Sequence, residues 1–312
     1  MRILFMGTPE FAVPSLEKLM EKHEIIGVFT KVDKPNTRGK KIKYTPVKEY
    51  ALEHNIPVYQ PNSLRVEETF EIIKELNPDL IVVVAYGKII PNNIIEYPKY
   101  GIINVHSSLL PKFRGAAPIN AAIIAGEKES GVTIMDIAEE LDAGDIILAG
   151  KTEISEEDTF LTLHDRLKVI GAEKLVEAVR AIEAGTAVRT SQNHSEATFV
   201  KPYKKTDCIV DWNKTKEEVF NFVRGMNPFP TAFTYHNEKV LKIYAIEKLD
   251  KIYDQGEIGE IVDVIKGKGF VVKVKDGSII LTNIKPENKK NISGNDSING
   301  NIFKLGEILK SN

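Results

Sequence analysis

The stretch Asp79-Leu-Ile-Val-Val-Val-Ala85 carries an apolar side chain at every position after its first. A short run of this kind, rich in β-branched valine and isoleucine, predicts a strand that is buried on both faces. Such strands lie at the centre of parallel sheets that are covered by helices on both sides. Residues 79–85 therefore predict the central strand of an α/β sheet.

Strand and helix patterns alternate on both sides of this central run. Apolar runs predict further strands at residues 2–6, 24–30, 57–59, 101–106, 131–137 and 145–152. Apolar residues that recur every three or four positions predict helices at residues 14–21, 46–53, 66–76 and 159–183. The alternation is typical of a doubly wound, largely parallel α/β domain, which we assign to residues 1–188.

The pattern changes after residue 188. Residues 189–207 show no periodicity and are interpreted as a linker. In residues 208–312, Thr215 and Glu218 form a capping box that begins a short helix, and Trp212 is expected in a core rather than on a base-stacking surface. Short apolar runs without intervening helices follow, at residues 232–235, 240–247, 259–264, 269–275 and 278–284. They predict a small C-terminal β-barrel that is OB-like.

Composition places the chain among soluble globular proteins. The 312 residues include a single cysteine, which excludes a disulfide framework and a multi-cysteine zinc site and fits a reducing compartment. The N-terminus lacks the pattern of a secretory signal, and no apolar run is long enough to predict a membrane span. We expect a cytoplasmic protein, and a monomer because no exposed apolar seam is apparent.

The formal net charge of −2 argues against a nucleic-acid partner when it is taken for the whole chain. The charge is unevenly distributed, however. Residues 31–48 hold seven basic residues and one acidic residue, and residues 201–205 hold three more basic residues, so the rest of the chain is strongly acidic. A basic run fits a solvated surface as well as a phosphate-binding one, and the charge pattern alone leaves both open.

Two common kinds of site have no signature here. Neither a Walker A motif nor the G-x-G-x-x-G fingerprint follows the first predicted strand, where Gly7-Thr8-Pro9 stands instead. A dinucleotide site at the first crossover is therefore not expected. No pair of histidines, or of histidine and glutamate, has the helical spacing of a metal site, and we expect no metal.

One segment carries residues suited to acyl transfer. Asn104 and His106 are two apart on a predicted strand, so both side chains project from one face near its carboxyl end. An amide beside an imidazole can donate hydrogen bonds to an oxygen that becomes anionic, although both residues also fit a capped strand end. Asp142, in Leu141-Asp-Ala-Gly-Asp145, fits turn chemistry or the orientation of an imidazole. Spacing alone does not bring it to His106.

These motifs together resemble the folate-dependent formyltransferase family. The resemblance rests on Asn104-Val-His106, Ser108-Leu-Leu-Pro111, Arg114-Gly-Ala-Ala-Pro-Ile119 and Leu141-Asp-Ala-Gly-Asp145. The opening Phe5-Met-Gly-Thr-Pro-Glu-Phe-Ala12, the segment Arg38-Gly-Lys-Lys41 and the segment from Arg224 to Thr231 extend it over essentially the whole chain. It implies transfer of the formyl group of 10-formyltetrahydrofolate to the α-amine of methionyl initiator tRNA, with no metal.

The resemblance also implies roles for individual residues. Asn104, His106 and Asp142 match the family's catalytic residues. The run Ser108, Leu109, Leu110 and Pro111 matches its tetrahydrofolate-binding run, which residues 85–90 and 136–142 would flank. Contacts with the acceptor stem of the tRNA would come from the basic residues Arg38, Lys40, Lys41 and Lys43.

Two other functions remain to be weighed. A formyltransferase that acts on an amino sugar or another small amine would keep Asn104, His106 and Asp142. It would have no use for the basic segment around Arg38 or for residues 224–231. A non-catalytic RNA-binding protein would have no reason to hold all three of the catalytic-type residues.

Overall fold

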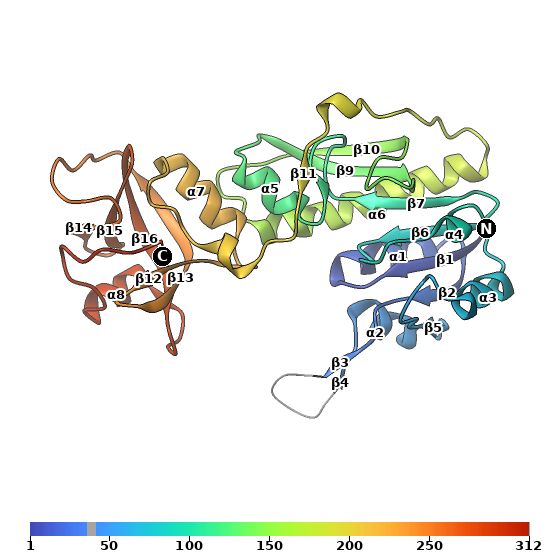
Figure 1. The fold of residues 1–312 in the computed structure, drawn as a ribbon, viewed down its shortest axis with the longest axis horizontal. Coiled ribbons are helices and arrows are strands. Elements are labelled where there is room, and N and C mark those ends of the chain that lie inside the picture. Colours follow the sequence, from blue (N-terminus) through green and yellow to red (C-terminus); the bar gives the residue numbers. More distant parts are fainter. Residues whose placement is uncertain (36–41, 312) are drawn as a thin grey trace. The chain divides into compact units, whose positions relative to one another are not determined.

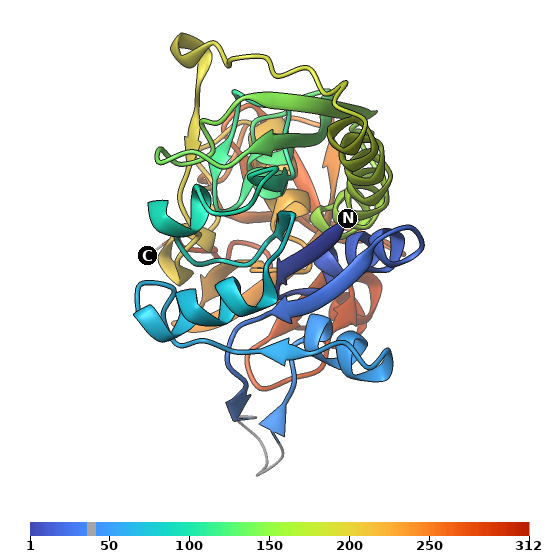
Figure 2. The same cartoon turned by 90° about the vertical axis from the view of Figure 1, so that its right-hand side faces the viewer.

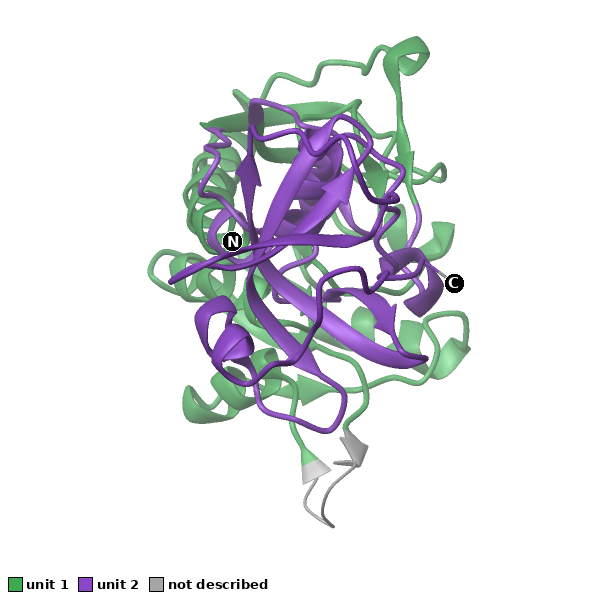
Figure 3. Cartoon of the chain, turned by 90° about the vertical axis from the view of Figure 1, so that its left-hand side faces the viewer, with its two compact units in different colours: residues 1–115, 130–152, 164–200 green, residues 116–129, 153–163, 201–312 purple. Residues whose placement is uncertain are grey.

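The computed structural model describes residues 1–35 and 42–311. The chain divides into two compact units (Figure 3). Unit 1 comprises residues 1–115, 130–152 and 164–200, and unit 2 comprises residues 116–129, 153–163 and 201–312. Among the helices of the described residues, none has both the length and the apolar composition that a membrane crossing requires.

Unit 1 is built on a seven-stranded sheet with the strand order β10-β9-β7-β6-β1-β2-β5 (Figure 1). The strands are β1 (Arg2–Gly7), β2 (Glu24–Phe29), β5 (Val58–Tyr59), β6 (Leu80–Val84), β7 (Ile102–His106), β9 (Glu129–Asp136) and β10 (Ile146–Glu153). The five strands from β5 to β7 in this order are parallel, whereas β9 is antiparallel to β7. This confirms the predicted largely parallel sheet, and β6, the strand predicted at its centre, is buried at every position.

Helices cover both faces of the sheet (Figure 2). The chain winds from β1 through β2 to β5, then returns to β6 on the other side of β1 and continues to β7. Because parallel crossovers are right-handed, this reversal places the helices of the two halves on opposite faces. The elements concerned are α1 (Val13–Met20) and α2 (Pro46–Glu53) in the first half, then α3 (Glu67–Leu76) and α4 (Asn92–Ile95) in the second.

The buried side chains follow this layering. Leu4 and Met6 of β1 and Ile81 and Val83 of β6 pack in one cluster with residues of α3 and α4. The long helix α6 (Phe160–Glu183) lies against β7 and β9, where a Cβ at Gly171 would be 3.1 Å from Val105. The reversal of winding at β1 makes the carboxyl ends of β1, β6 and β7 the expected place for a ligand crevice.

Several short elements of unit 1 were not predicted. Residues 34–35 (β3) pair with residues 42–43 (β4), and β8 (Arg114–Gly115) pairs in parallel with β11 (Phe199–Val200). The 3-10 turns η1 (Glu10–Ala12) and η2 (His194–Glu196) complete the unit. The pairing of β8 with β11 means that the loop after β7 is bonded to a segment that the sequence suggested was a linker. The division at residues 188 and 207 stays a prediction.

Unit 2 contains an antiparallel sheet with the strand order β12-β13-β16-β15-β14, on which β17 pairs with β16. Its strands are β12 (Ala232–His236), β13 (Lys239–Leu249), β14 (Ile261–Ile265), β15 (Gly269–Val274), β16 (Gly277–Pro286) and β17 (Ile292–Ser293). Its helices are α5 (Pro118–Ile124), η3 (Lys205–Cys208), α7 (Lys216–Gly225) and α8 (Gly294–Asn299). The predicted capping box is present, since the Thr215 side chain accepts from the Glu218 N–H and Glu218 accepts from the Thr215 N–H.

The last residues of the chain close this sheet into the predicted small barrel. On one edge, the N–H groups of Tyr235 and Lys310 each donate to the other residue's carbonyl oxygen, at 3.0 and 2.9 Å. On the other edge, the N–H of Ile261 donates to the Glu307 carbonyl at 2.8 Å. Residues 307–310 therefore bridge the free edges of β12 and β14. Trp212 lies in the core beneath, 2% exposed, as predicted.

Candidate active site

His106 is the last residue of β7 and is only 5% exposed. Its Nε2 atom lies 3.0 Å from the carbonyl oxygen of Phe113. Because a carbonyl oxygen only accepts, Nε2 must carry a hydrogen and donate it. The Nδ1 atom lies 3.6 Å from Oδ2 of Asp142, too far for a hydrogen bond but close enough for an ion pair when the ring is charged. The imidazole is therefore held between a carbonyl and a carboxylate.

Asp142 reaches His106 through an indirect chain path. Since β9 is antiparallel to β7, its last residue, Asp136, lies opposite Ile103, and the turn that follows must cross back to reach His106. Asp142 has a left-handed backbone with φ of 50°, and its Oδ2 atom accepts the Gly115 N–H at 2.8 Å. A Cβ at Gly144 would be 1.8 Å from the Asp136 carbonyl oxygen, so this tight turn requires glycine there.

A buried glutamine braces the same turn. Nε2 of Gln192, which is 5% exposed, donates to the carbonyl oxygens of Asp142 and Gly144 at 2.9 and 2.7 Å. Its Oε1 atom accepts from Nε and Nη2 of Arg114 at 3.2 and 2.6 Å. Arg114 is itself 2% exposed, and Nη2 also donates to Nδ1 of His194 at 3.2 Å.

No sequence pattern indicated this brace. Gln192 lies in a segment without periodicity. Arg114 belongs to one of the motifs that resemble the family, but the sequence predicts no individual role for it. The carbonyl of Phe113 and the N–H of Gly115 were missed because backbone groups carry no residue-type signal. The structure brings together His106 and Asp142, as the family resemblance implied, and adds these four partners around them.

Asn104 occupies the middle of β7, on the same face as His106. Its register partners are Val83 on β6 and Met135 on β9, and its side chain is half-buried. The strand therefore presents an amide and an imidazole side by side, with Asp142 behind the imidazole. An amide and an imidazolium so placed can stabilise an oxygen that gains negative charge in the transition state.

The run predicted to bind tetrahydrofolate uses its polar atoms to shape its own loop. The Ser108 hydroxyl donates to the Lys112 carbonyl at 2.7 Å. The Thr133 hydroxyl donates to the Ser108 carbonyl at 2.7 Å and accepts the Leu110 N–H at 3.2 Å. Ser108 and Leu110 are buried, whereas Leu109 and Pro111 are half-buried. Leu109 and Pro111 are thus the members of the run with surface to offer to a ligand.

The two segments predicted to flank this run contain groups with shifted pKa values. Burial raises the pKa of Tyr86 to about 12, and its hydroxyl has no hydrogen-bond partner among the described residues. Burial also raises the pKa of Asp136, although Nε of Arg189 lies 2.7 Å from its Oδ2 atom and acts in the opposite direction. Both residues are close in sequence to the ends of core strands, as expected for groups that line a crevice.

The predicted tRNA-binding residues are only partly described. Lys43 is exposed on β4, where its backbone pairs with that of Lys34. Arg38, Lys40 and Lys41 lie outside the described residues. The second basic segment belongs to unit 2, where Lys201, Lys204 and Lys205 are all exposed.

One group of potential metal ligands occurs among the described residues. It combines Glu10, His164 and Asp165, whose ligand atoms lie within 4.8 Å of one another. The Lys168 ammonium nitrogen lies 2.6 Å from Glu10 and 3.0 Å from Asp165. An ammonium group thus already lies within ion-pair distance of both carboxylates, and we assign no metal to this cluster.

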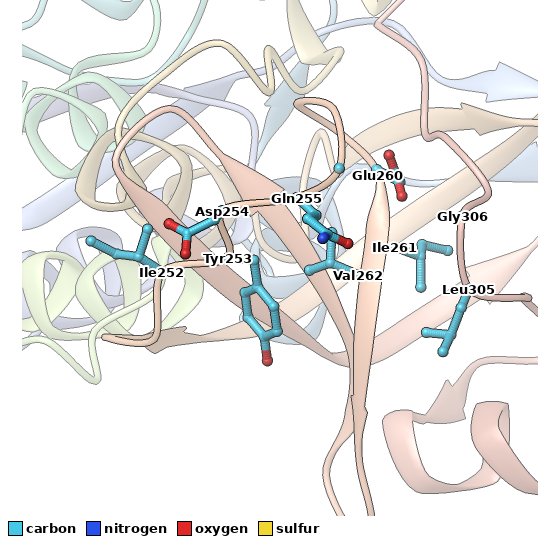
Figure 4. Close-up of a pocket in the computed structure, with 10 residues that line it drawn as sticks. Ile252, Tyr253, Asp254, Gln255, Glu260, Ile261, Val262, Leu305 and Gly306 are labelled. Carbon is cyan, nitrogen blue, oxygen red and sulfur yellow. The ribbon is translucent and has the colours of Figure 1, made fainter.

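A cavity of about 450 Å³ lies on the barrel of unit 2 (Figure 4). Its lining includes the carboxylates of Asp254 and Glu260, together with Tyr253 and Leu305. Two carboxylates repel phosphate and carboxylate groups, so this cavity does not suit a folate or an RNA backbone. None of the residues predicted to act in catalysis or binding lines it.

Comparisons with known proteins cover both units. The chain matches the family model described as formyl transferase over residues 1–179 and the model described as formyl transferase, C-terminal domain, over residues 202–301. A methionyl-tRNA formyltransferase of Fusobacterium nucleatum is 58% identical over 309 residues, 99% of this chain and 100% of the relative. One of Clostridioides difficile is 47% identical over 310 residues, with 99% and 100% covered.

Solved structures share the fold at much lower identity. WlaRD, a sugar 3N-formyl transferase crystallised in the presence of dTDP and 5-N-formyl-THF, superimposes with a TM-score of 0.67. It is 22% identical, and the match covers 93% of this chain and 99% of that one. At this level of identity the likeness shows a common architecture alone.

Proposed function

Because the chain belongs to the formyl transferase family, we propose that it transfers the formyl group of 10-formyltetrahydrofolate to the α-amine of methionyl initiator tRNA. It thus acts as a methionyl-tRNA formyltransferase in translation initiation. The observation that carries this function is the position of Asp142 beside His106, which lies two residues after Asn104 on β7. The chain also matches relatives named methionyl-tRNA formyltransferase over 99% of its length. The alternative, an amino-sugar substrate, fits the shared fold and the same three residues, but it has no use for the basic segment around Arg38.

The chemistry follows from the groups around His106. The methionyl amine attacks the formyl carbon, and the carbonyl electron pair moves onto oxygen. The Asn104 amide and the Nε2–H group of His106 donate hydrogen bonds to that oxygen. To do so, the Nε2–H group must break its hydrogen bond to the Phe113 carbonyl oxygen. The bond from carbon to the N10 atom of the folate then breaks, the amine nitrogen loses a proton and N10 gains one. Asp142 orients His106 and assists this proton transfer.

We propose that the folate binds against the run from Ser108 to Pro111. Hydrogen bonds make this loop rigid, since Thr133 bonds both Ser108 and Leu110. A rigid loop at the carboxyl edge of β7 suits a planar pteridine ring, and the neutral hydroxyl of Tyr86 leaves one buried polar atom for a ligand or a water to satisfy. Residues 85–90 and 136–142 flank the ring.

We propose that the tRNA binds to two basic segments. Arg38, Lys40, Lys41 and Lys43 contact phosphates of the acceptor stem, and Lys201, Lys204 and Lys205 supply further positive charge. Contacts of this kind make binding strongly dependent on salt. The protein works as a monomer in the cytoplasm, where initiator tRNA is charged.

One assay tests this function. The protein is incubated with 10-formyltetrahydrofolate and methionyl initiator tRNA, and the amino acid is released and analysed for N-formylmethionine. Parallel reactions contain methionyl elongator tRNA or a nucleotide-linked amino sugar. We expect product with initiator tRNA only. Formylated sugar without formylated methionine would contradict the assignment.

A further inference from the structure

Gln192 connects three separate parts of unit 1. It lies in the segment before η2, yet its side-chain amide bonds to the turn that carries Asp142 and to the loop after β7 that carries Arg114. It is buried, although the segment around it is exposed. Burying a polar side chain costs free energy unless each of its polar atoms has a hydrogen-bond partner, so the partners of Gln192 decide what its burial costs.

The contacts of Gln192 satisfy its amide completely. Its two N–H hydrogens serve two carbonyl oxygens that are two residues apart, Asp142 O and Gly144 O, and its oxygen receives two N–H groups of Arg114. This uses both donors and both lone pairs of the side chain. The opposite orientation of the amide would place its oxygen against the two carbonyls and its NH₂ group against the guanidinium, so only one orientation is compatible with these neighbours.

This arrangement fixes the backbone from which the Asp142 carboxylate projects. Asp142 holds a left-handed backbone, which costs a non-glycine residue free energy and persists only where the surroundings impose it. Gln192 donates hydrogen bonds to the carbonyl oxygens of Asp142 and Gly144, the residues on either side of Ala143. The Asp142 side chain itself is held by the Gly115 N–H, which adjoins Arg114. Gln192 and Arg114 thus connect the turn that carries Asp142 to the loop after β7, whose Gly115 N–H group binds the Asp142 carboxylate.

We propose that Gln192 is a positioning residue, which sets the place of the Asp142 carboxylate beside His106 through the carbonyl oxygens of the turn. This rests on the proposed formyl transfer and deepens it. A shift of the carboxylate by about 1 Å is enough to cost on the order of 10²-fold in rate where geometry controls a proton transfer. The hydrogen bonds of the Gln192 side chain go to Asp142, Gly144 and Arg114. None of these three residues is among those predicted to bind folate or tRNA, so the Michaelis constants should be insensitive to Gln192.

The test uses a substitution of equal size. Gln192→Glu retains an acceptor for Arg114 but replaces the NH₂ donor with an oxygen that faces two carbonyls. We expect kcat to fall by about 10- to 100-fold, with KM for folate and for tRNA within about twofold of the original values. Ser191→Ala is the matched control, since Ser191 bonds the side chain of Asp145 on the same turn from the neighbouring position, and it should leave kcat unchanged. If the glutamate variant fails to fold, the same measurement is made on Gln192→Met, whose side chain has a similar length and can occupy the same buried position.

A double-mutant cycle with Asp142→Asn separates positioning from a general structural role. If Gln192 acts through the Asp142 carboxylate, the substitution at 192 should have little further effect on kcat once that charge is gone. An equal fold-loss in both backgrounds would overturn the proposal, as would an unchanged kcat in the single variant. Failure of the unmodified protein to form formylmethionine is a different result, which would contradict the proposed function itself.

Discussion

The Nδ1 atom of His106 lies 3.6 Å from Oδ2 of Asp142, while that same oxygen accepts the Gly115 N–H at 2.8 Å. The carboxylate is therefore anchored by a backbone N–H group, and its distance from Nδ1 is that of an ion pair rather than of a hydrogen bond. The other ring nitrogen donates to Phe113. A proton added to Nδ1 would point at the carboxylate, which is the arrangement that a positively charged donor at this position needs.

The first prediction concerns this charge. Asp142→Asn retains an oxygen that can accept the Gly115 N–H, so the turn should keep its shape, but it removes the negative charge beside His106. We expect turnover to fall by about 10²–10³-fold, with the affinity for methionyl initiator tRNA nearly unchanged. Single-turnover formylation and a filter-binding titration give the two quantities. His106→Ala should behave in the same way, and weakened tRNA binding in either variant would contradict the assignment of both residues to chemistry.

The central strand and the doubly wound order could be predicted because they depend on local pattern. The run 79–85 is apolar throughout, and β6 is buried at every position. The barrel strands were found for the same reason and predicted a closed barrel, but the residues that close it were not identified. Residues 307–310 bridge two edges by backbone bonds, and such bonds leave no mark on residue type.

The site shows the same limit. Asn104 and His106 could be paired from their spacing on one strand. Asp142 could not, because β9 runs antiparallel and its turn crosses back over a distance that spacing does not encode. Gln192 was missed because its contacts lie 48 to 78 residues away along the chain. Residues that hold a site together by long-range contacts within an aperiodic segment have no sequence pattern to find them by.

The second prediction concerns the basic segment. Arg38→Ala should raise KM for methionyl initiator tRNA and leave folate binding unchanged, because the guanidinium is assigned to a phosphate. Removal of one phosphate-binding side chain should reduce the slope of log affinity against log salt concentration by about 1. Binding titrations over a range of salt measure it. Lys43→Ala should act in the same direction, and Lys22→Ala, an exposed lysine outside both basic segments, serves as the control. An unchanged slope for Arg38→Ala would refute this role.

The third prediction concerns Trp212. Its Nε1–H donates to the Thr234 hydroxyl at 3.1 Å, and that hydroxyl donates to the Lys310 carbonyl at 2.8 Å. Trp212→Phe removes the first bond and leaves a space in the barrel core, so unit 2 should lose about 1–3 kcal/mol of stability. Calorimetry follows the transition of the barrel. Phe229→Leu, at a side chain that is 70% exposed, should cost little. Weaker tRNA binding by Trp212→Phe without loss of stability would instead indicate a base-stacking role.

The last prediction concerns the capping box of α7. The backbone N–H of Thr215, followed by its hydroxyl, lowers the pKa of Glu218 from 4.5 to about 2. A carboxyl whose pKa is depressed on folding stabilises the protein above its unfolded pKa, and that contribution is lost as the pH falls from 4.5 towards about 2.

Glu218→Gln should therefore lower the melting temperature at neutral pH, and the difference from the original protein should shrink as the pH falls through this interval. Thermal melts at a series of pH values measure it. Because Glu218 is exposed to solvent, added salt should reduce the part of the effect that comes from the charge of Lys214, while the bonds to Thr215 persist. Thr215→Ala removes the hydroxyl but keeps the backbone N–H, so it should reduce the pH-dependent part of the melting-temperature difference without abolishing it. A melting difference that is the same at every pH would show that the Glu218 charge plays no part in the cap.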